Sequence, residues 1–360
     1  LILLPQPNLA SRLLRLVLCW GATTWFPQNL QNATLLNLGH SNLERHAYLR
    51  SIRRRNLRLV CLIHDLIPLT HPEYCRQEQQ TIHAQRIHNA LTLSAALVAN
   101  SRATLSELET YSAANLLPLP PAVPALIAAD PLPAPSPDRP IREPYFVLIG
   151  TIEPRKNYAF LLQLWREIAL QRDPADTPHL LLIGQRGWEC ENIVDLLERC
   201  PSLRGLVREI NSCSDREMAT VLHHAQALLF PSFSEGFGLP IAEALAAGVP
   251  VLASDLPVFR EFAGDIPEYL SPLDGAQWQK NILDYASPSS PRRAAQLARL
   301  SRFAPPSWDA HFQAVHALLE PLRQNAPTPP ASLRPSHAHA NTRHSHAELD
   351  DAEPIPTAPQ

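Results

Sequence analysis

Two carboxylates, Glu235 and Glu243, lie eight positions apart in the stretch 231–245, where a strand is expected to lead into a helix. The apolar run 227–230 predicts a short buried parallel strand, and Pro240 is a residue favoured at the first position of a helix. In open α/β sheets, ligands bind at the carboxyl ends of strands. The two carboxylates can therefore bind a hydroxyl-rich ligand whose anionic part faces the helix amides.

A second strand–loop–helix junction carries two adjacent cations. Gly150 ends the apolar run 145–150, and Arg155 and Lys156 precede the helix that begins near Asn157. Two side-chain charges at a helix start, together with backbone amides, suit a diphosphate. The pattern is not a P-loop, and surface Arg and Lys are common at helix starts, so this junction alone does not decide the ligand.

A third junction ends in a histidine. The apolar run 57–63 predicts a buried strand that leads directly into His64 and Asp65. This position is again the carboxyl end of a strand. The residues leave two interpretations open, an element of the site or a structural turn.

The folded part of the sequence contains no metal-binding pattern. There is no Asp-x-Asp, no HExxH and no His/Cys cluster with ligand spacing. We therefore expect no metal and no cofactor. The charge of a departing diphosphate would be neutralised by Arg155, Lys156 and helix amides.

Length and composition indicate an ordinary globular protein of two domains. The 360 residues are 45% hydrophobic and 18% charged. A net charge of −3 gives no support for a nucleic-acid partner. The six cysteines are scattered without a CxxC pair, which is typical of free thiols in a reducing cytoplasm.

The apolar stretch 1–20 is interrupted by prolines and arginines and does not predict a membrane span. Residues 9–20 fit either a core-facing helix or an amphipathic helix on a membrane surface. A basic cluster follows at Arg50, Arg53, Arg54, Arg55 and Arg58. It is either a solvated face or a contact for anionic headgroups or an anionic acceptor.

The order of elements predicts an α/β protein with doubly wound parallel sheets. Residues 1–116 form an N-terminal Rossmann-like domain, and 117–144 hold ten of the 37 prolines and form the linker. Residues 145–325 form a second Rossmann-like domain with a final helix, and 326–360 are a tail too poor in apolar residues for a core.

Apolar runs predict strands at 34–38, 57–63, 95–100, 145–150, 179–184, 205–209, 226–230 and 250–253. Helices are predicted near 81–89, 157–171, 190–199, 214–223, 240–247, 257–263 and 276–285, with Ser101 capping one more. A last helix is predicted from Ser307 to about Leu319, ahead of Pro321.

Three stretches together resemble the retaining, nucleotide-sugar-dependent glycosyltransferases of family 4. They are the segment Gly150 to Asn157, the segment 231–245 with its two glutamates, and the segment 248–255. His64-Asp-Leu-Ile-Pro and Ser307-Trp308 are also similar to that family. The subgroup that the chain most resembles builds bacterial surface polysaccharides and often transfers mannose.

The resemblance implies a GT-B fold, in which two Rossmann-like domains face a cleft. It implies that Arg155 and Lys156, after the turn at Gly150, hold the diphosphate of the donor. Glu235 would contact the hydroxyls of the transferred sugar, and Glu243 would bind the ribose.

The amides of Phe237, Gly238 and Leu239 would lie close to sugar and phosphate, and His64 near the transferred sugar. The family retains the anomeric configuration, which is commonly explained by front-face attack with the leaving phosphate accepting the proton. On that view the two glutamates are not a hydrolase acid/nucleophile pair.

The implied reaction moves a hexose, such as mannose, from GDP-mannose or a UDP-sugar to a glycan or lipid-linked oligosaccharide. We expect a metal-independent cytoplasmic enzyme that contacts the inner face of the plasma membrane. The rival hypotheses are a non-catalytic remnant that binds a nucleotide or a partner enzyme, and another GT-B chemistry such as an epimerase or phosphorylase.

The N-terminal part departs from the family. Members usually begin with a strand and a glycine-rich loop, whereas only Gly21 and Gly39 precede His64. We therefore expect the N-terminal domain to be incomplete, and the activity of the chain as given depends on that missing part.

Overall fold

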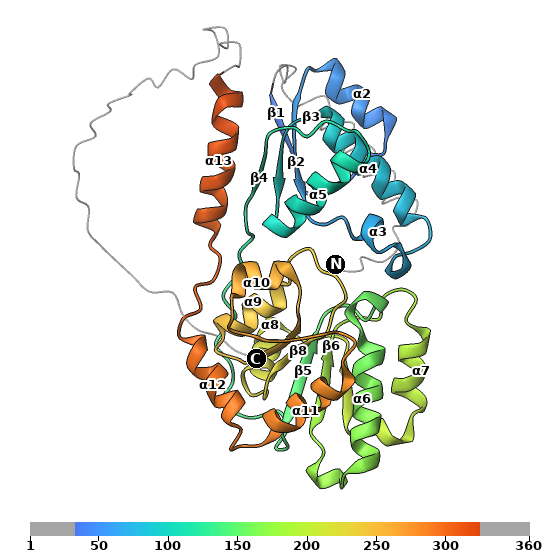
Figure 1. Ribbon diagram of the computed structural model, residues 1–360, viewed down its shortest axis with the longest axis vertical. Coiled ribbons are helices and arrows are strands. Elements are labelled where there is room, and N and C mark those ends of the chain that lie inside the picture. Colours follow the sequence, from blue (N-terminus) through green and yellow to red (C-terminus); the bar gives the residue numbers. More distant parts are fainter. Residues whose placement is uncertain (1–32, 325–360) are drawn as a thin grey trace, which may run out of the picture. The chain divides into compact units, whose positions relative to one another are not determined.

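The computed structural model describes residues 33–324, which build two parallel sheets (Figure 1). The first sheet has the order β1-β2-β3-β4, and all its neighbours pair in parallel. Its strands are β1 (Thr34–Asn37), β2 (Arg58–Ile63), β3 (Ser94–Ala99) and β4 (Ala122–Pro124). The strands predicted at 34–38, 57–63 and 95–100 are thus confirmed.

Helices connect these strands and cover one face of the sheet. They are α2 (His46–Arg54), α3 (Ile67–Thr70), a 3-10 turn (Pro72–Tyr74), α4 (Gln79–Leu93) and α5 (Arg102–Ala114). Leu59, Cys61 and Ile63 alternate along β2 and pack with the buried residues of α2, α4 and α5. The predicted cap of α5 is present, because Ser101 Oγ accepts a hydrogen bond from Thr104 N at 3.0 Å.

The opposite face is covered by α13 (Trp308–Gln324), from the far end of the described chain (Figure 1). Val60, Ala96 and Val98 of the sheet pack with apolar residues of α13, among them Val315 and Leu318. The sequence analysis assigns this helix to the second domain, whereas it packs on the first sheet.

The prediction that this helix ends before Pro321 is wrong, since Pro321 lies inside it. Proline removes one backbone hydrogen bond from a helix interior. Beyond it, Leu322 still packs on the sheet, and its carbonyl accepts a hydrogen bond from the Arg58 guanidinium. These contacts hold the last turn.

The proline-rich stretch 117–144, which the sequence predicts as a linker, contains the strand β4. β4 pairs with β3 through Leu97 N to Pro121 O at 2.9 Å and Ala125 N to Ala99 O at 2.8 Å. Proline is tolerated there because β4 is an edge strand, with one side that needs no donor.

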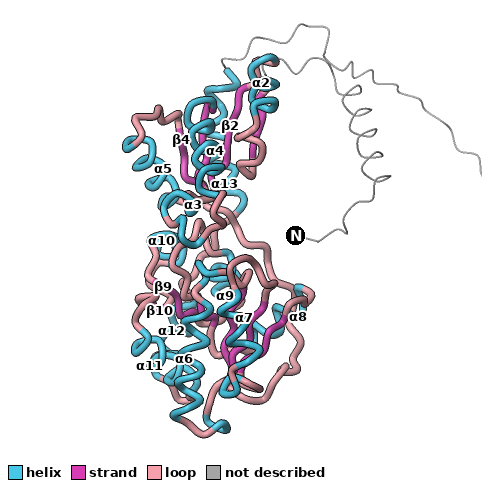
Figure 2. The backbone as a smooth tube through the Cα atoms, turned by 90° about the vertical axis from the view of Figure 1, so that its right-hand side faces the viewer, coloured by secondary structure: helices cyan, strands magenta, loops and turns pink. Residues whose placement is uncertain are grey.

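The second sheet has six parallel strands in the order β10-β9-β8-β5-β6-β7, the doubly wound order of a Rossmann fold. Figure 2 draws the strands of both sheets in magenta. The six strands are β5 (Tyr145–Ile149), β6 (His179–Ile183), β7 (Val207–Ile210), β8 (Leu228–Phe230), β9 (Val251–Ser254) and β10 (Glu268–Leu270). The sequence analysis predicts the first five and misses β10.

Helices pack on both faces of this sheet. They are α6 (Tyr158–Gln171), α7 (Glu191–Arg199), α8 (Asp215–His223), α9 (Leu239–Ala246), α10 (Pro257–Ala263), α11 (Gly275–Ala286) and α12 (Pro291–Leu300). Phe146 and Leu148 of β5 pack with Trp165 of α6 on one face. Val147 and Ile149 face α9 and α10 on the other.

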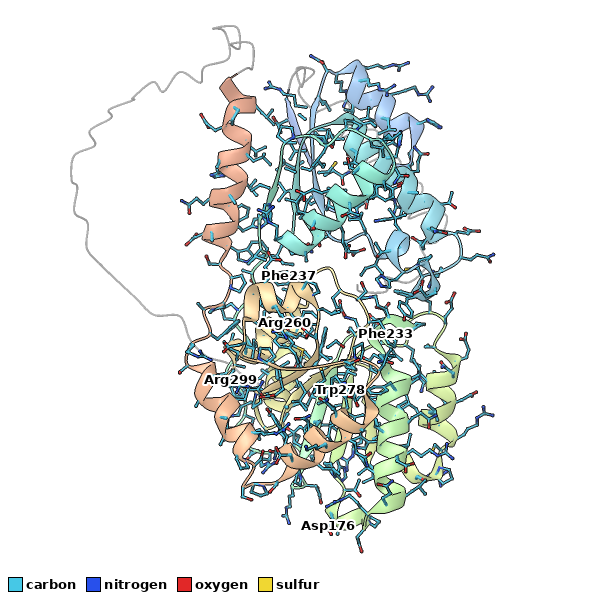
Figure 3. The ribbon with its side chains drawn as sticks, in the orientation of Figure 1. Asp176, Phe233, Phe237, Arg260, Trp278 and Arg299 are labelled. Atoms are coloured by element: carbon cyan, nitrogen blue, oxygen red, sulfur yellow. The ribbon has the colours of Figure 1, made fainter. Side chains whose placement is uncertain are left out.

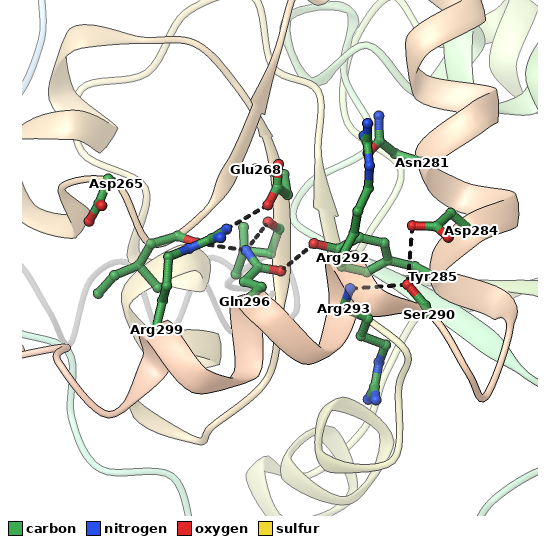
Figure 4. Close-up of polar contacts among 12 residues, drawn as sticks. Asp265, Glu268, Asn281, Asp284, Tyr285, Ser290, Arg292, Arg293, Gln296 and Arg299 are labelled. Carbon is green, nitrogen blue, oxygen red and sulfur yellow. Dashed lines mark hydrogen bonds and ion pairs between the residues drawn. The ribbon is translucent and has the colours of Figure 1, made fainter.

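α12 is absent from the sequence prediction, and its anchor explains why (Figure 4). Its buried residue is Gln296, whose amide donates to Val251 O at 2.7 Å and Ile266 O at 3.0 Å. Gln296 Oε1 accepts from Tyr285 OH at 3.0 Å. Because the buried residue of this helix is polar, its sequence lacks the apolar periodicity from which a helix is predicted.

The predictions for 9–20 and 326–360 lie outside the described residues. The domain limits at 116, 144 and 325 stay predictions. Within 33–324, no helix is both long and apolar enough to cross a bilayer. The five cysteines of this part are all free.

Candidate active site

The loop 231–238, between β8 and α9, holds Glu235 in a cluster of buried charges. Glu235 Oε1 lies 2.6 Å from Lys156 Nζ, and its Oε2 lies 2.6 Å from Arg155 Nη1. Both cations come from the 3-10 turn Pro154–Lys156, which follows β5. The two loops meet because β5 and β8 are neighbours in the sheet and both end at the same edge.

Further hydrogen bonds join the two loops. Arg155 Nη1 donates to Ser234 O at 2.8 Å, and Phe233 N donates to Arg155 O at 2.9 Å. Asn157, in the left-handed conformation at φ 59°, donates from Nδ2 to Pro231 O at 3.2 Å. Lys156 Nζ lies 4.8 Å from the centre of the Phe230 ring. The position of each charged group is therefore fixed by backbone as well as by charge.

Glu235 is held in its ionised form. Burial alone would raise the pKa of its carboxyl, but the charges of Lys156 and Arg155, and their hydrogen bonds, lower it below the ordinary value. An ionised carboxylate is an acceptor only. Glu235 can thus accept hydrogen bonds from ligand hydroxyls and cannot serve as a general acid.

A second carboxylate, Glu153, completes the cluster. Its Oε1 lies 2.5 Å from Arg155 Nη2, and burial raises its pKa against the lowering effect of Arg155 and Lys156. Its Oε2 has no hydrogen-bond partner in the described part of the chain. Two cations and two carboxylates balance, so the cluster is formally neutral.

Two glycines allow the backbone to pass close to this cluster. A Cβ on Gly184 would lie 1.9 Å from Gly150 O, so the residues that directly follow β5 and β6 touch each other. A Cβ on Gly150 would lie 3.4 Å from Lys156 Cε. Gly150 O also accepts from Tyr158 OH at 2.6 Å. Gly150 thereby leaves room for the Lys156 side chain.

The residues around the start of α9, where Figure 3 labels Phe237, divide between core and surface by their burial. Phe237 is buried and stacks on Phe262 at 4.8 Å between ring centres, and Gly238 has φ 106° with Phe259 against it. Leu239 is 36% exposed. The predicted contacts of their amides with a ligand stay predictions.

Glu243 lies in a different cavity from Glu235. It faces a space of about 320 Å³ whose wall includes Asp130, Pro131 and His223. Burial raises the pKa of Glu243, and the negative charges of Asp215 and Asp130 raise it further. The arrangement does not pair the two glutamates across one cavity, and the ribose contact predicted for Glu243 stays a prediction.

His64 presents its backbone, not its ring, to the loop that carries Glu235. A Cβ on Gly236 would lie 2.3 Å from His64 O. The imidazole Nε2 is 2.6 Å from Leu38 O, and His64 N donates to His40 Nε2 at 3.1 Å. Asp65 Oδ1 accepts a hydrogen bond from Ile67 N at 3.1 Å, a contact that stabilises a structural turn. These contacts do not test whether the turn is an element of the site, so both hypotheses stay open.

Two cavities adjoin the Glu235 cluster on different sides. One, of about 610 Å³, is lined by Arg155, Arg76, Asp65 and Trp188, and the Arg76 guanidinium lies 5.6 Å from the centre of the Trp188 ring. The other, of about 640 Å³, is lined by Glu235 together with residues of α5.

The sequence analysis missed Arg76 and Trp188. Trp188 had a usable signal, because it follows the glycines that end β6, at the same sheet edge as Arg155. Arg76 gives no such signal. Among residues 33–324, no group of three or more His, Cys, Asp or Glu side chains is arranged to hold a metal ion.

Comparisons with known proteins agree with this architecture. The model of the family described as "Glycosyl transferases group 1" matches residues 143–286. The chain is 30% identical over 267 residues to O-antigen chain mannosyltransferase B of Escherichia coli, covering 70% of this chain and 67% of that protein. It is 31% identical over 148 residues to O-antigen chain mannosyltransferase RfbU of Salmonella typhimurium, covering 39% and 38%.

Solved structures show the same fold. Sucrose-phosphate synthase of Thermosynechococcus elongatus superposes with a TM-score of 0.62 at 17% identity, covering 89% of this chain and 80% of that one. Trehalose 6-phosphate synthase of Burkholderia multivorans gives 0.64 at 12% identity, covering 90% and 79%. The predicted GT-B fold is therefore confirmed, and the chain belongs to the group 1 glycosyl transferases.

Proposed function

We propose that the protein transfers a mannosyl residue from a nucleotide-diphosphate sugar to a glycan or lipid-linked oligosaccharide during synthesis of a bacterial surface polysaccharide. The observation that carries the proposal is the buried cluster of Glu235, Arg155 and Lys156 at the adjoining ends of β5 and β8. The names of the relatives support the choice of mannose and of a polysaccharide product.

In this proposal Glu235 accepts hydrogen bonds from the hydroxyls of the transferred hexose. Arg155 and Lys156 lie beside it and stabilise the negative charge that develops on the departing diphosphate. The cations are already neutralised by Glu235 and Glu153, so they are held in place before the donor binds and need no reorganisation during the reaction.

The proposed reaction retains the anomeric configuration. The acceptor oxygen forms a bond to the anomeric carbon on the face from which the phosphate oxygen departs. The hydroxyl proton passes to the leaving phosphate, which makes a side-chain base unnecessary. Because Glu235 is ionised and both its oxygens are ion-paired, it is suited to orienting the sugar and not to proton transfer.

Turnover measurements test the proposal. Purified protein is incubated with GDP-mannose, UDP-glucose or ADP-glucose and an O-antigen-type mannan acceptor, with and without EDTA. We expect release of GDP with transfer of mannose, unchanged by EDTA. Strong inhibition by EDTA would contradict the metal-independent part of the proposal.

Titration with GDP, UDP and ADP separates an enzyme from a remnant. Saturable binding that Glu243→Ala weakens, combined with turnover, supports the transferase. Binding without turnover favours a non-catalytic protein. If none of the three nucleotides binds, the donor site is assigned wrongly.

We also propose a cytoplasmic protein whose helix α2 contacts the inner face of the plasma membrane. Arg50, Arg53 and Arg54 of α2 are exposed, as are Arg45 before it and Arg55 after it. Exposed arginines near an anionic leaflet contribute about 1 kcal/mol each to binding. Sedimentation with phosphatidylglycerol vesicles, compared with phosphatidylcholine vesicles, tests this contact.

A further inference from the structure

A cavity of about 640 Å³ lies between α5 and the loop that carries Glu235. Its walls are held together by specific contacts. Glu261 of α10 accepts from Arg102 N at 2.7 Å and Ala103 N at 3.1 Å, which fixes the start of α5. Ser101 Oγ donates to Gly236 O at 3.4 Å. The cavity is thus a built feature of the fold.

The lining of this cavity suits a sugar ring. Apolar surface comes from Ala103, Val258 and Phe233, whose ring is backed by Tyr74 at 5.1 Å between centres. Hydroxyl groups come from six residues, Thr70, Thr104, Ser106, Thr110, Tyr111 and Ser234. A hexose has apolar C–H faces and a rim of hydroxyls, and such mixed pockets bind it through few oriented polar groups.

Two of these hydroxyls, those of Thr110 and Thr70, are oriented to accept. Thr110 Oγ1 donates its hydrogen to Ser106 O at 2.8 Å, and Thr70 Oγ1 donates to Leu66 O at 3.3 Å. A hydroxyl has one hydrogen and two lone pairs, so these oxygens keep a lone pair for a ligand hydroxyl.

Glu107 is the carboxylate of the α5 wall, and it differs from Glu235 on the other side. Glu235 uses both oxygens in ion pairs. No hydrogen bond or ion pair of the Glu107 carboxylate is found within residues 33–324, and Glu107 is half-buried. Burial raises the pKa of Glu107, and Asp65 raises it further. A partly desolvated carboxylate without a partner is stabilised by hydroxyl donors of a ligand.

We propose that this cavity binds the terminal sugar of the glycan acceptor, and that Glu107 accepts hydrogen bonds from hydroxyls of that sugar. The inference rests on the proposed function, in which Glu235 on the facing wall contacts the transferred hexose. A sugar held by Glu107 lies in the same cavity as Glu235, where an acceptor hydroxyl can approach the donor.

The test compares Glu107→Gln with Glu109→Gln. Glu109 is exposed on the same helix and does not line the cavity. The full chain, saturated with GDP, is titrated with the four mannobioses linked α-1,2, α-1,3, α-1,4 and α-1,6. We expect Glu107→Gln to lower the affinity for the mannobiose that binds best by about tenfold or more, because a hydrogen bond to a charged group is lost. Glu109→Gln should bind as the parent chain does.

The same variants are titrated with GDP alone. GDP affinity should be unchanged in Glu107→Gln, since the groups proposed to hold the nucleotide, Arg155, Lys156 and Glu243, do not line this cavity. Unfolding curves identify any variant with a damaged fold, and Thr110→Ala then provides a second change to the same wall, with a smaller expected loss of mannobiose affinity.

The inference is overturned if Glu107→Gln binds mannobiose as tightly as the parent chain, or if the parent chain binds none of the four disaccharides. It is also overturned if GDP affinity falls in parallel with mannobiose affinity. Failure of the proposed function looks different. In that case no nucleotide binds and no mannose is transferred, while mannobiose binding still depends on Glu107.

Discussion

Glu235 and Glu243 belong to one short stretch of sequence, yet their surroundings are opposite. Glu235 is ion-paired with two cations, and their charges lower its pKa. Glu243 faces a cavity with two acids near it, and burial and those charges raise its pKa. The comparison shows that the protein's own cations stabilise the charge of one carboxylate before a ligand binds. The charge of the other carboxylate lacks such a partner in the described part of the chain and would be stabilised by a ligand.

The difference follows from the sheet. Glu235 lies in the loop after β8, directly beside the loop after β5 that supplies Arg155 and Lys156. Glu243 lies within α9, past the sheet edge, where its neighbours are α8 and the stretch 129–135. Position relative to the β5–β8 boundary decides which glutamate receives cations.

The largest effect should come from Glu235→Gln. Removing one partner of a buried ion pair leaves the other charges uncompensated, which costs about 3–5 kcal/mol. We expect a fall of this size in the free energy of unfolding, together with loss of turnover. Urea unfolding and a transfer assay measure the two effects.

The control is Glu198→Gln, which removes an exposed carboxylate paired with Arg186. Exposed pairs contribute about 0–1 kcal/mol, so its unfolding curve should hardly move. A similar small change in Glu235→Gln would show that the buried cluster is not what holds the two loops together.

A double-mutant cycle sharpens the first prediction. Lys156→Met alone should destabilise the protein, since it leaves Glu235 with one cation. In the Glu235→Gln background the same change should cost less, with a coupling of about 1–3 kcal/mol. Additive losses in the cycle would contradict a direct interaction.

Glu243→Gln should behave in the opposite way. Burial and the nearby charges of Asp215 and Asp130 disfavour its ionised carboxylate, so neutralising it should not lower the free energy of unfolding at neutral pH. Nucleotide affinity should fall by about tenfold if Glu243 binds ribose hydroxyls. Calorimetric titration with GDP measures this, and unchanged affinity would reject the ribose assignment.

The smallest effects should appear in the pH dependence of stability. Glu235 has a lowered pKa, so its charge stabilises the fold above the ordinary carboxyl pKa of about 4.3, and this is lost as the pH falls through the lowered value. Glu243 has a raised pKa, so its ionisation reduces stability as the pH rises through that value. Unfolding of the parent and Gln variants from pH 7 to pH 3 tests both signs.

In that series the deficit of Glu235→Gln should shrink at the acid end. The higher free energy of unfolding of Glu243→Gln relative to the parent chain should vanish below about pH 4, where the Glu243 carboxyl is protonated in the folded and the unfolded state. Parallel curves for all three proteins would mean that neither group titrates differently in the folded and unfolded states.

Much of the second sheet could be predicted because its strands are continuous apolar runs, as the fully buried residues of β5 show. The motif around Glu235 was predicted as a ligand site. Its ion pairs with Arg155 and Lys156 were not, because they depend on which strands are neighbours. Apolar periodicity does not predict a helix that is anchored by a buried amide, as α12 is by Gln296. The sequence also does not show that the Glu107 carboxylate lines a cavity without a partner among residues 33–324, because this depends on the tertiary structure.

The packing of α13 on the first sheet has a consequence for synthesis of the chain. A ribosome releases Val60, Ala96 and Val98 first, then the entire second sheet, and only at the end the helix that covers them. Domains generally fold in the order in which they emerge. Here the earlier sheet keeps an apolar face uncovered until the last described helix is made, so any fragment that ends before residue 308 should aggregate through that face.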